Sequence, residues 1–269
     1  MNFGISTKVL RDYSLEEAIG IAREFGFGEM EFWVDDLLEA DISPEEIVAV
    51  TDAWGIGRSV HLRTEDLNIA SFNEPIRAES VSQHMEGIRL AARLEARTAT
   101  LHPGRKAAKT RTWEAAWQRQ LESIDALARC AEEEGVILCV EAMEQLSGEF
   151  ILTGADLDRV IRSLRRPQLA CTLDISHLHT VGDVCSQLEL AKHLPVGNVH
   201  ISQSRGTKPH LTVFDPQGEI DFGKVLPKLR EFYGGTLILE GYVAGKGREI
   251  AEKSMEWFRE LSSGLGKEE

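Results

Sequence analysis

Short apolar runs alternate along this chain with longer stretches in which apolar residues recur at helical spacing. The short runs are rich in Val, Ile, Leu and Phe, as expected for parallel strands that are buried on both faces. They predict eight strands, at Phe3–Thr7, Glu29–Val34, Arg58–Leu62, Thr98–Leu101, Val136–Glu141, Gln168–Asp174, Gly197–Ser202 and Gly235–Glu240. Helices are predicted at Leu15–Phe25, from Ser43 onward, and at Glu79–Ala96, Trp113–Glu134, Gly154–Leu164, Val184–Leu194, Phe222–Phe232 and Arg248–Leu261.

Strict alternation of strand and helix implies parallel strands that are joined by helical crossovers. Eight such pairs in 269 residues match a (β/α)8 barrel, which commonly runs to about 250 residues, better than an open doubly wound sheet. No GxGxxG or GxxxxGK[ST] motif follows any predicted strand, which weakens the nucleotide-binding alternative. No linker divides the chain. We therefore predict the α/β class and a single TIM-barrel domain over residues 1–269.

Composition narrows the class of protein. Apolar residues make up 42% and charged residues 28%, and the net charge of −14 disfavours a broad nucleic-acid surface. This net charge does not exclude a local basic pocket. No apolar stretch approaches the roughly 18 residues of a membrane span, and the first residues lack the features of a signal peptide, so we expect a cytoplasmic protein. No CxxC spacing occurs, which predicts reduced thiols at Cys130, Cys139, Cys171 and Cys185.

Four successive strands in the second half of the chain end on a residue that can bind a metal. These residues are Glu141, Asp174, His200 and Glu240. Because the C-terminal ends of barrel strands meet at one mouth, we expect the four side chains to face a common centre. Three carboxylates so close together repel one another, and a divalent cation is the simplest compensation. Oxygen ligands with one imidazole suit Mn²⁺, Mg²⁺ or Co²⁺, with Zn²⁺ also open; in the alternative, each acid merely begins a solvated loop.

Further histidines follow strands at equivalent places. His61 ends the third predicted strand and His102 the fourth, while His177 lies three residues beyond Asp174. His210 lies in the loop after the seventh strand. All four are expected near the barrel mouth. His84, His179 and His193 lack that placement and are predicted to be surface or packing residues.

In its eightfold alternation and its strand-end residues, the chain resembles the xylose isomerase-like TIM-barrel superfamily. That superfamily groups sugar and sugar-phosphate isomerases and epimerases with the endonuclease IV type of DNA repair enzyme. The resemblance implies that Glu141, Asp174, His200 and Glu240 hold one divalent metal. It also implies that Glu141 and Glu240 act as the acid–base pair and that His177 contacts the substrate. The expected partner is a small sugar or sugar-phosphate molecule, and the expected reaction passes through an enediolate.

Several other residues are predicted to contact that substrate. Trp33 could form an apolar wall against a sugar ring, or it could simply pack in the barrel. Basic residues after the strands would favour an anionic substrate if they gather at the mouth, and the segment from Arg105 to Arg111 could hold a phosphate or a DNA backbone. Arg205 follows His200 by five residues, where the sugar epimerases usually have an arginine at six. The full substrate-binding prediction is Trp33, His61, His102, Arg105, Arg205, Lys208 and His210.

Endonuclease IV provides the main alternative, with up to three Zn²⁺ ions. The resemblance implies nine ligands, of which this chain supplies eight, and Lys208 stands where the ninth, an aspartate, would be expected. The eight are His61, His102, Glu141, Asp174, His177, His200, His210 and Glu240. The acidic balance argues against a DNA partner. The third hypothesis is a non-catalytic barrel that binds a metal or another ligand. A homo-oligomer is also open, because the predicted helix Trp113–Glu134 could pack against a partner subunit, although nothing requires it.

Overall fold

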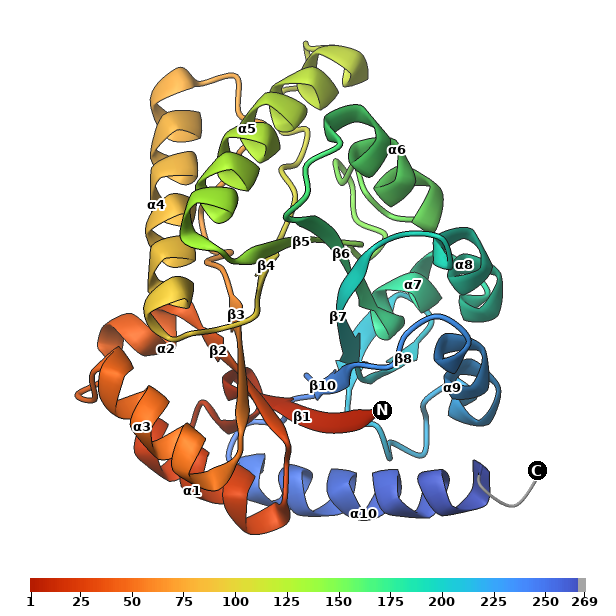
Figure 1. Cartoon of the computed structure of the whole chain (residues 1–269). Helices are drawn as coiled ribbons and strands as arrows, with labels where there is room; N and C mark the ends of the chain where they lie inside the picture. Colours follow the sequence, from red (N-terminus) through yellow and green to blue (C-terminus); the bar gives the residue numbers. More distant parts are fainter. Residues whose placement is uncertain (266–269) are drawn as a thin grey trace.

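Eight parallel strands form a closed barrel in the computed structural model, which describes residues 1–265. Around the barrel the strands follow the order β1-β10-β7-β6-β5-β4-β3-β2, so the first strand pairs with the last (Figure 1). The predicted (β/α)8 architecture is confirmed. The strands are β1 (Asn2–Ser6), β2 (Glu29–Trp33), β3 (Gly57–His61), β4 (Thr98–Leu101), β5 (Ile137–Glu141), β6 (Leu169–Asp174), β7 (Val196–Ile201) and β10 (Thr236–Leu239).

Helices surround the barrel as an outer layer (Figure 1). Two of them begin with capping boxes in which a serine hydroxyl and a glutamate exchange hydrogen bonds with the backbone, at Ser14 with Glu17 and at Ser43 with Glu46. The helices are η1 (Thr7–Leu10), α1 (Leu15–Phe25), α2 (Val34–Glu39), α3 (Pro44–Trp54), α4 (Glu74–Arg93), α5 (Trp113–Glu134), α6 (Gly154–Leu164), α7 (Ile175–Val181), α8 (Val184–Ala191), α9 (Phe222–Arg230) and α10 (Gly247–Leu265).

The structure differs from the prediction mainly at the carboxyl ends of the strands. Three short helices, η1, α2 and α7, follow β1, β2 and β6 directly. An antiparallel hairpin of β8 (Gln203–Arg205) and β9 (Lys208–Leu211) follows β7, where a loop was expected. Helix α4 also begins at Glu74, five residues before the predicted start at Glu79. Most of these additions lie where an active site of this architecture is built.

Apolar residues fill the space between the strands and the helices, while part of the barrel interior is polar. Glu31, Thr100, Thr172 and Asn198 are all buried there and connected by hydrogen bonds. The four cysteines are free thiols, as predicted. Burial raises the pKa of Cys139 to about 12, so that thiol is unreactive at neutral pH.

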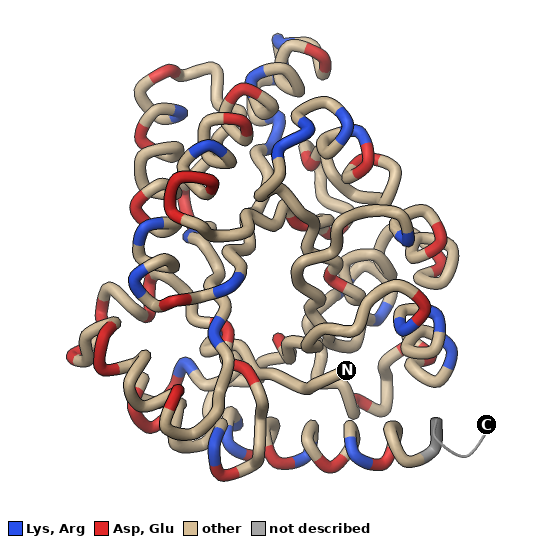
Figure 2. The backbone as a smooth tube through the Cα atoms, viewed as in Figure 1, with Lys and Arg blue, Asp and Glu red and all other residues tan. Residues whose placement is uncertain are grey.

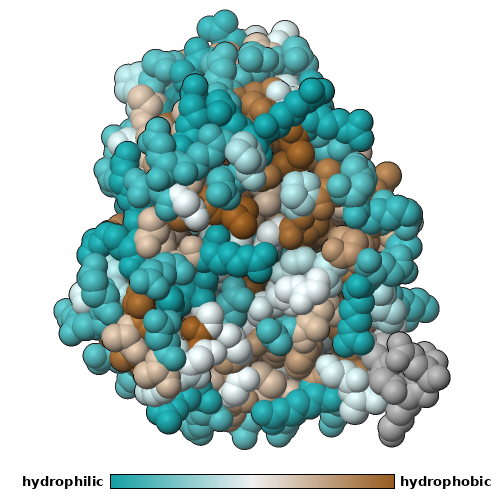
Figure 3. Space-filling view, in the orientation of Figure 1, coloured by the Kyte–Doolittle hydropathy of each residue, from teal (hydrophilic) through white to brown (hydrophobic). Residues whose placement is uncertain are grey.

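Charged residues lie mainly on the outer helices and loops, with both signs interspersed (Figure 2). The face shown in Figure 3 is largely hydrophilic, with apolar patches between the helices. Large exposed apolar side chains come from separate elements, for example Leu38, Trp113 and Leu190. Over residues 1–265, no helix is long and apolar enough to cross a membrane.

Candidate metal centre

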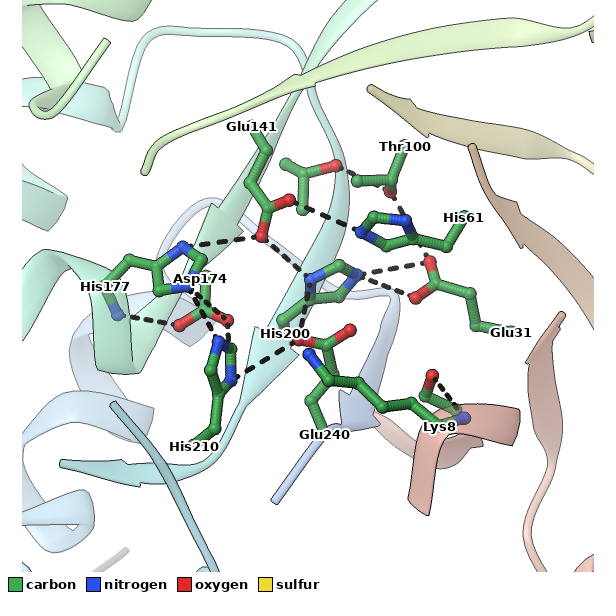
Figure 4. Close-up of polar contacts among 12 residues, drawn as sticks. Lys8, Glu31, His61, Thr100, Glu141, Asp174, His177, His200, His210 and Glu240 are labelled. Carbon is green, nitrogen blue, oxygen red and sulfur yellow. Dashed lines mark hydrogen bonds and ion pairs between the residues drawn. The ribbon is translucent and has the colours of Figure 1, made fainter. Parts of the chain in front are cut away.

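The four strand-end residues meet at one end of the barrel. Glu141 ends β5, Asp174 ends β6, His200 lies near the end of β7, and Glu240 directly follows β10. One potential ligand atom from each lies within 4.8 Å of the others. None of the four is more than 2% exposed. The convergence expected from the sequence is therefore present in the fold, and Figure 4 shows the four side chains turned toward one centre.

The hydrogen bonds of these groups leave selected oxygens free. Asp174 Oδ1 accepts from the Ser176 hydroxyl at 2.7 Å and from the His177 backbone N–H at 2.8 Å, while its Oδ2 has no hydrogen-bond partner among residues 1–265. Glu240 Oε1 is likewise buried without one. A buried carboxylate oxygen without a partner is costly unless a cation compensates it. The donor set fits a divalent cation, because carboxylate oxygens and one imidazole are ligands for Mn²⁺, Mg²⁺, Co²⁺ and Zn²⁺.

The charges at the centre are strongly coupled. Burial raises the pKa of Glu141, but His102 and His200 outweigh it and hold that pKa well below its usual range. His200 and Lys8 likewise outweigh burial at Glu240 and lower its pKa. Burial and the neighbouring carboxylates raise the pKa of Asp174. Burial lowers the pKa of His200, but Glu240, Glu31 and Glu141 raise it by a larger amount, so this pKa lies well above its usual value.

His177 and His210 flank the centre on the Asp174 side. Because Asp174 caps helix α7, the residue three positions later, His177, is held in the first turn beside it. His177 Nδ1 donates to the carbonyl of Ala142 at 2.9 Å, and His177 Nε2 lies 3.0 Å from His210 Nε2. His210 Nδ1 lies 3.7 Å from Glu240 Oε2. Both histidines are thus at the barrel mouth, as expected.

On the opposite flank, His102 and His61 approach Glu141. His102 Nε2 lies 2.9 Å and His61 Nε2 3.6 Å from Glu141 Oε2. The Trp33 ring stacks on the His61 ring, with centroids 4.1 Å apart and planes 9° apart, and its indole N–H donates to Ser6 Oγ. Trp33 therefore stacks on His61 at the barrel mouth, and its contact with a substrate stays a prediction.

The basic residues that follow the strands, among them Arg63 after β3, do not form one cluster. Arg63 pairs with Asp35 at 2.7 Å and Arg205 donates to Gln217 at 2.5 Å. Lys208 is exposed in the β8–β9 hairpin, and the Arg105 backbone is fixed by Asn68 at 2.9 Å and 3.1 Å. In residues 1–265, none of these cations forms an ion pair or hydrogen bond with the four strand-end residues. Arg105, Arg205 and Lys208 as substrate-binding residues stay a prediction.

Two residues near the centre were missed. Glu31 on β2 is fully buried, and its two carboxylate oxygens lie 3.0 Å and 3.2 Å from His200 Nε2. Lys8 on η1 lies 4.9 Å from the Trp33 ring centroid, and its charge helps to lower the pKa of Glu240 (Figure 4). The sequence carried no distinct signal for Glu31, because it lies in an alternating run, Glu29-Met30-Glu31-Phe32. Lys8 directly follows the predicted first strand, where the strand-end rule would have found it.

A small polar cavity lies beside His102. It has a volume of about 110 Å³, and its lining includes Arg63, His84, Arg105 and Glu149. His84 is only 3% exposed, so the packing role predicted for it is the one observed. Burial, with Glu144 nearby, raises the pKa of Glu149 to about 7.

Comparisons with known proteins agree with this fold. A family model described as "Xylose isomerase-like TIM barrel" matches residues 19–261. The uncharacterised protein MJ1311 of Methanocaldococcus jannaschii is 25% identical over 267 residues, covering 95% of this chain and 90% of MJ1311. A crystal structure of a D-tagatose 3-epimerase-like protein superposes with a TM-score of 0.87 at 24% identity, covering 100% of this chain and 99% of the other. A structure of L-ribulose 3-epimerase does so with a TM-score of 0.86 at 19% identity, covering 99% and 96%.

Proposed function

Because the chain belongs to the xylose isomerase-like TIM barrel family, we propose that it is a divalent-metal-dependent isomerase or epimerase of a sugar, a sugar phosphate or a related polyhydroxy carbonyl compound. One observation carries the proposal: Glu141, Asp174, His200 and Glu240 offer ligand atoms within 4.8 Å of one another at the barrel mouth. The likeness in fold to L-ribulose 3-epimerase supports it.

Glu141, Asp174, His200 and Glu240 would hold the cation. Bound there, a divalent ion acts as a Lewis acid toward the carbonyl of the substrate. Asp174 Oδ2, Glu240 Oε1 and Glu141 Oε2, which have no hydrogen-bond partner within residues 1–265, would be available to bind the ion. Mn²⁺, Mg²⁺, Co²⁺ and Zn²⁺ all suit this donor set.

Glu141 and Glu240 would move the protons. The pKa of each lies below its usual range, so both are carboxylates at neutral pH and either can accept a proton. One takes the proton from the carbon beside the carbonyl; the electron pair of that C–H bond forms a carbon–carbon double bond, and the π pair of the carbonyl moves onto its oxygen to give an enediolate. Return of a proton to the other face, or to the adjacent carbon, completes an epimerisation or an isomerisation. His177 would donate a hydrogen bond to a substrate hydroxyl.

Proton exchange in deuterated water tests this reaction class. The protein is loaded with Mn²⁺, Mg²⁺, Co²⁺ or Zn²⁺ and incubated with ketoses, aldoses and their phosphates, and deuterium beside the carbonyl is measured by NMR or mass spectrometry. We expect incorporation into at least one substrate. Glu141→Gln and Glu240→Gln should lower the exchange rate about 10²–10⁴-fold, the usual contribution of general acid–base catalysis. The matched control is Glu29→Gln, at the start of β2 and so at the end of the barrel away from the centre. It should incorporate deuterium into the substrate at the wild-type rate. Absence of exchange by the metal-loaded protein over the whole panel would refute the proposal.

A second function, zinc-dependent phosphodiester cleavage, is favoured by one observation. Within residues 1–265, three further triads of potential ligands share residues with the centre, and two of them, His61–His102–Glu141 and Asp174–His177–His210, lie on its two flanks; the third is His61–His200–Glu240. Three zinc ions could therefore lie side by side, as in the endonuclease IV reading. Against it, Lys208 occupies the expected position of the ninth ligand, and the net charge is −14. Metal analysis separates the two: one ion per chain supports sugar chemistry, whereas two or three zinc ions with nicking of abasic DNA support phosphodiester cleavage. Bound metal with neither activity supports a binding protein.

A further inference from the structure

Glu31 places a fourth carboxylate directly behind the predicted metal ligands. It comes from β2, which is not a neighbour of β7 in the barrel, so its side chain reaches across the barrel interior to His200. Both residues are 0% exposed. The carboxylate lies on the Nε2 side of the His200 ring, at 3.0 Å and 3.2 Å, and not among the atoms that surround the candidate ion (Figure 4).

Asn198 fixes the direction of the hydrogen bonds around Glu31. Its Oδ1 accepts from the Val199 backbone N–H at 2.9 Å, which sets the orientation of the amide. Its Nδ2 then donates to Glu31 Oε2 at 2.7 Å and to Thr100 Oγ1 at 3.1 Å. An amide nitrogen carries two protons, and both are used. Although Asn198 Nδ2 also lies 3.1 Å from His200 Nε2, it has no proton left for it.

His200 Nε2 must therefore supply its own proton. A carboxylate only accepts, and the two nearest oxygens to Nε2 belong to Glu31. With Nε2–H donated to Glu31, the neutral ring has its lone pair on Nδ1. Nδ1 is the atom that lies 3.1 Å from Glu141 Oε1 and 3.5 Å from Glu240 Oε2. Without a cation, Nδ1 lies at hydrogen-bond distance from Glu141 Oε1 and donates a proton to it; a cation bound among these carboxylates would replace that proton and take the Nδ1 lone pair.

We propose that Glu31 is a positioning residue of the metal centre. Its carboxylate holds His200 with Nε2 protonated, so that Nδ1 binds the cation. Ligating histidines commonly donate their second N–H to a carboxylate, and this orients the ring and makes it a stronger ligand. The inference rests on the metal site of the proposed function, but not on the reaction or the substrate. Glu31 itself takes no proton from the substrate and does not touch the ion.

Metal affinity tests the role of Glu31. Mn²⁺ binding is measured by calorimetry on the metal-free full chain for the wild type, Glu31→Gln and Glu29→Gln. Glu29 is the same residue type at the first position of the same strand, at the far end of the barrel. We expect Glu31→Gln to bind Mn²⁺ about 10–100-fold more weakly, the usual effect of losing such a partner, and Glu29→Gln to bind like the wild type. A folded Glu31→Gln protein with wild-type affinity would overturn the role of Glu31.

A second measurement needs no variant, so it holds even if Glu31→Gln fails to fold. In the Zn²⁺-loaded wild type, nitrogen-15 NMR of the histidine rings reports which nitrogen binds zinc. We expect Nδ1 of His200 to be bound and its Nε2 proton to be retained and slow to exchange. Zinc on Nε2 would overturn the proposal. If the wild type binds no divalent ion at all, both the role of Glu31 and the metal site of the proposed function are refuted. Weak catalysis with normal metal binding would count against the proposed reaction but not against the role of Glu31.

Discussion

The buried imidazole of His84 should lower the free energy of unfolding as the pH falls, and the substitution His84→Gln should remove this effect. His84 lies on α4 and is 3% exposed. Burial, followed by the charges of His102, His61 and Arg63, lowers its pKa from 6.5 to about 4. In the unfolded chain the same group is protonated below its ordinary value. We therefore expect His84→Gln, which cannot titrate, to flatten the pH dependence of the free energy of unfolding.

The sign follows from proton binding. Between pH 6.5 and about 4 the unfolded state holds a proton on His84 that the folded state does not, so the folded state loses stability as the pH falls. With those two pKa values, lowering the pH from 7.5 to 5 removes about 2 kcal/mol of stability through this group alone. The loss approaches about 3 kcal/mol below pH 4, since each pH unit corresponds to about 1.36 kcal/mol.

Urea unfolding at pH 7.5 and pH 5, in the presence of a chelator, measures the effect. The difference between the two pH values should be smaller by about 2 kcal/mol in His84→Gln than in the wild type. His193→Gln is the matched control, because His193 is about half exposed; its pH difference should stay within about 0.5 kcal/mol of the wild type. If the wild type and His84→Gln lose equal stability on acidification, His84 is not held neutral by burial and the reasoning is wrong.

Other predictions concern the cavity, the backbone and the metal. Because the pKa of Glu149 is raised from 4.5 to about 7 by burial and by Glu144, stability is lost as the pH rises through that range; Glu149→Gln should add about 1 kcal/mol in urea unfolding at pH 8, after allowance for its partial exposure, and an equal gain at pH 4 would contradict this cause. A Cβ on Gly104 would lie 2.5 Å from the Ala70 backbone nitrogen, whereas a Cβ on Gly20 in α1 meets no atom within 4 Å. Gly104→Ala should therefore destabilise by about 1–3 kcal/mol and Gly20→Ala should stabilise by about 0.5–1 kcal/mol, and the opposite order of melting temperatures would refute the packing argument. Saturating Mn²⁺ should raise the melting temperature of chelator-treated protein, since an ion at 100 times its Kd adds about 2.7 kcal/mol; an unchanged temperature would count against the centre.

Much of the fold and the centre could be predicted from sequence because the residues obey a rule that holds along the chain. Strands buried on both faces are short apolar runs, and each predicted barrel strand agrees with the observed one to within one residue at both ends. A carboxylate at the end of such a run interrupts its apolar pattern. Glu141 and Asp174 therefore stood out without any knowledge of their neighbours in space.

Other parts depended on contacts between distant residues. Glu29-Met30-Glu31-Phe32 has the alternating pattern of a strand with one solvated face. Glu31 is recognisable as part of the centre only once the barrel is closed and Asn198 and His200 lie beside it. Asp174 was assigned to the metal alone, so its second role as the cap of α7 was missed, although its two oxygens have separate roles. The β8–β9 hairpin also has no apolar run to predict it.

The pairing of β1 with β10, from Asn2 beside Thr236 to Ile5 beside Leu239, has a consequence for how the protein is made. During synthesis, β1 must wait with one edge unpaired until β10, which follows all the other strands of the barrel, has also been made. Exposed strand edges invite association with other chains, so nascent chains would be vulnerable to aggregation until β10 pairs with β1. The same delay means that an ion cannot find all four ligands until residue 240 has emerged.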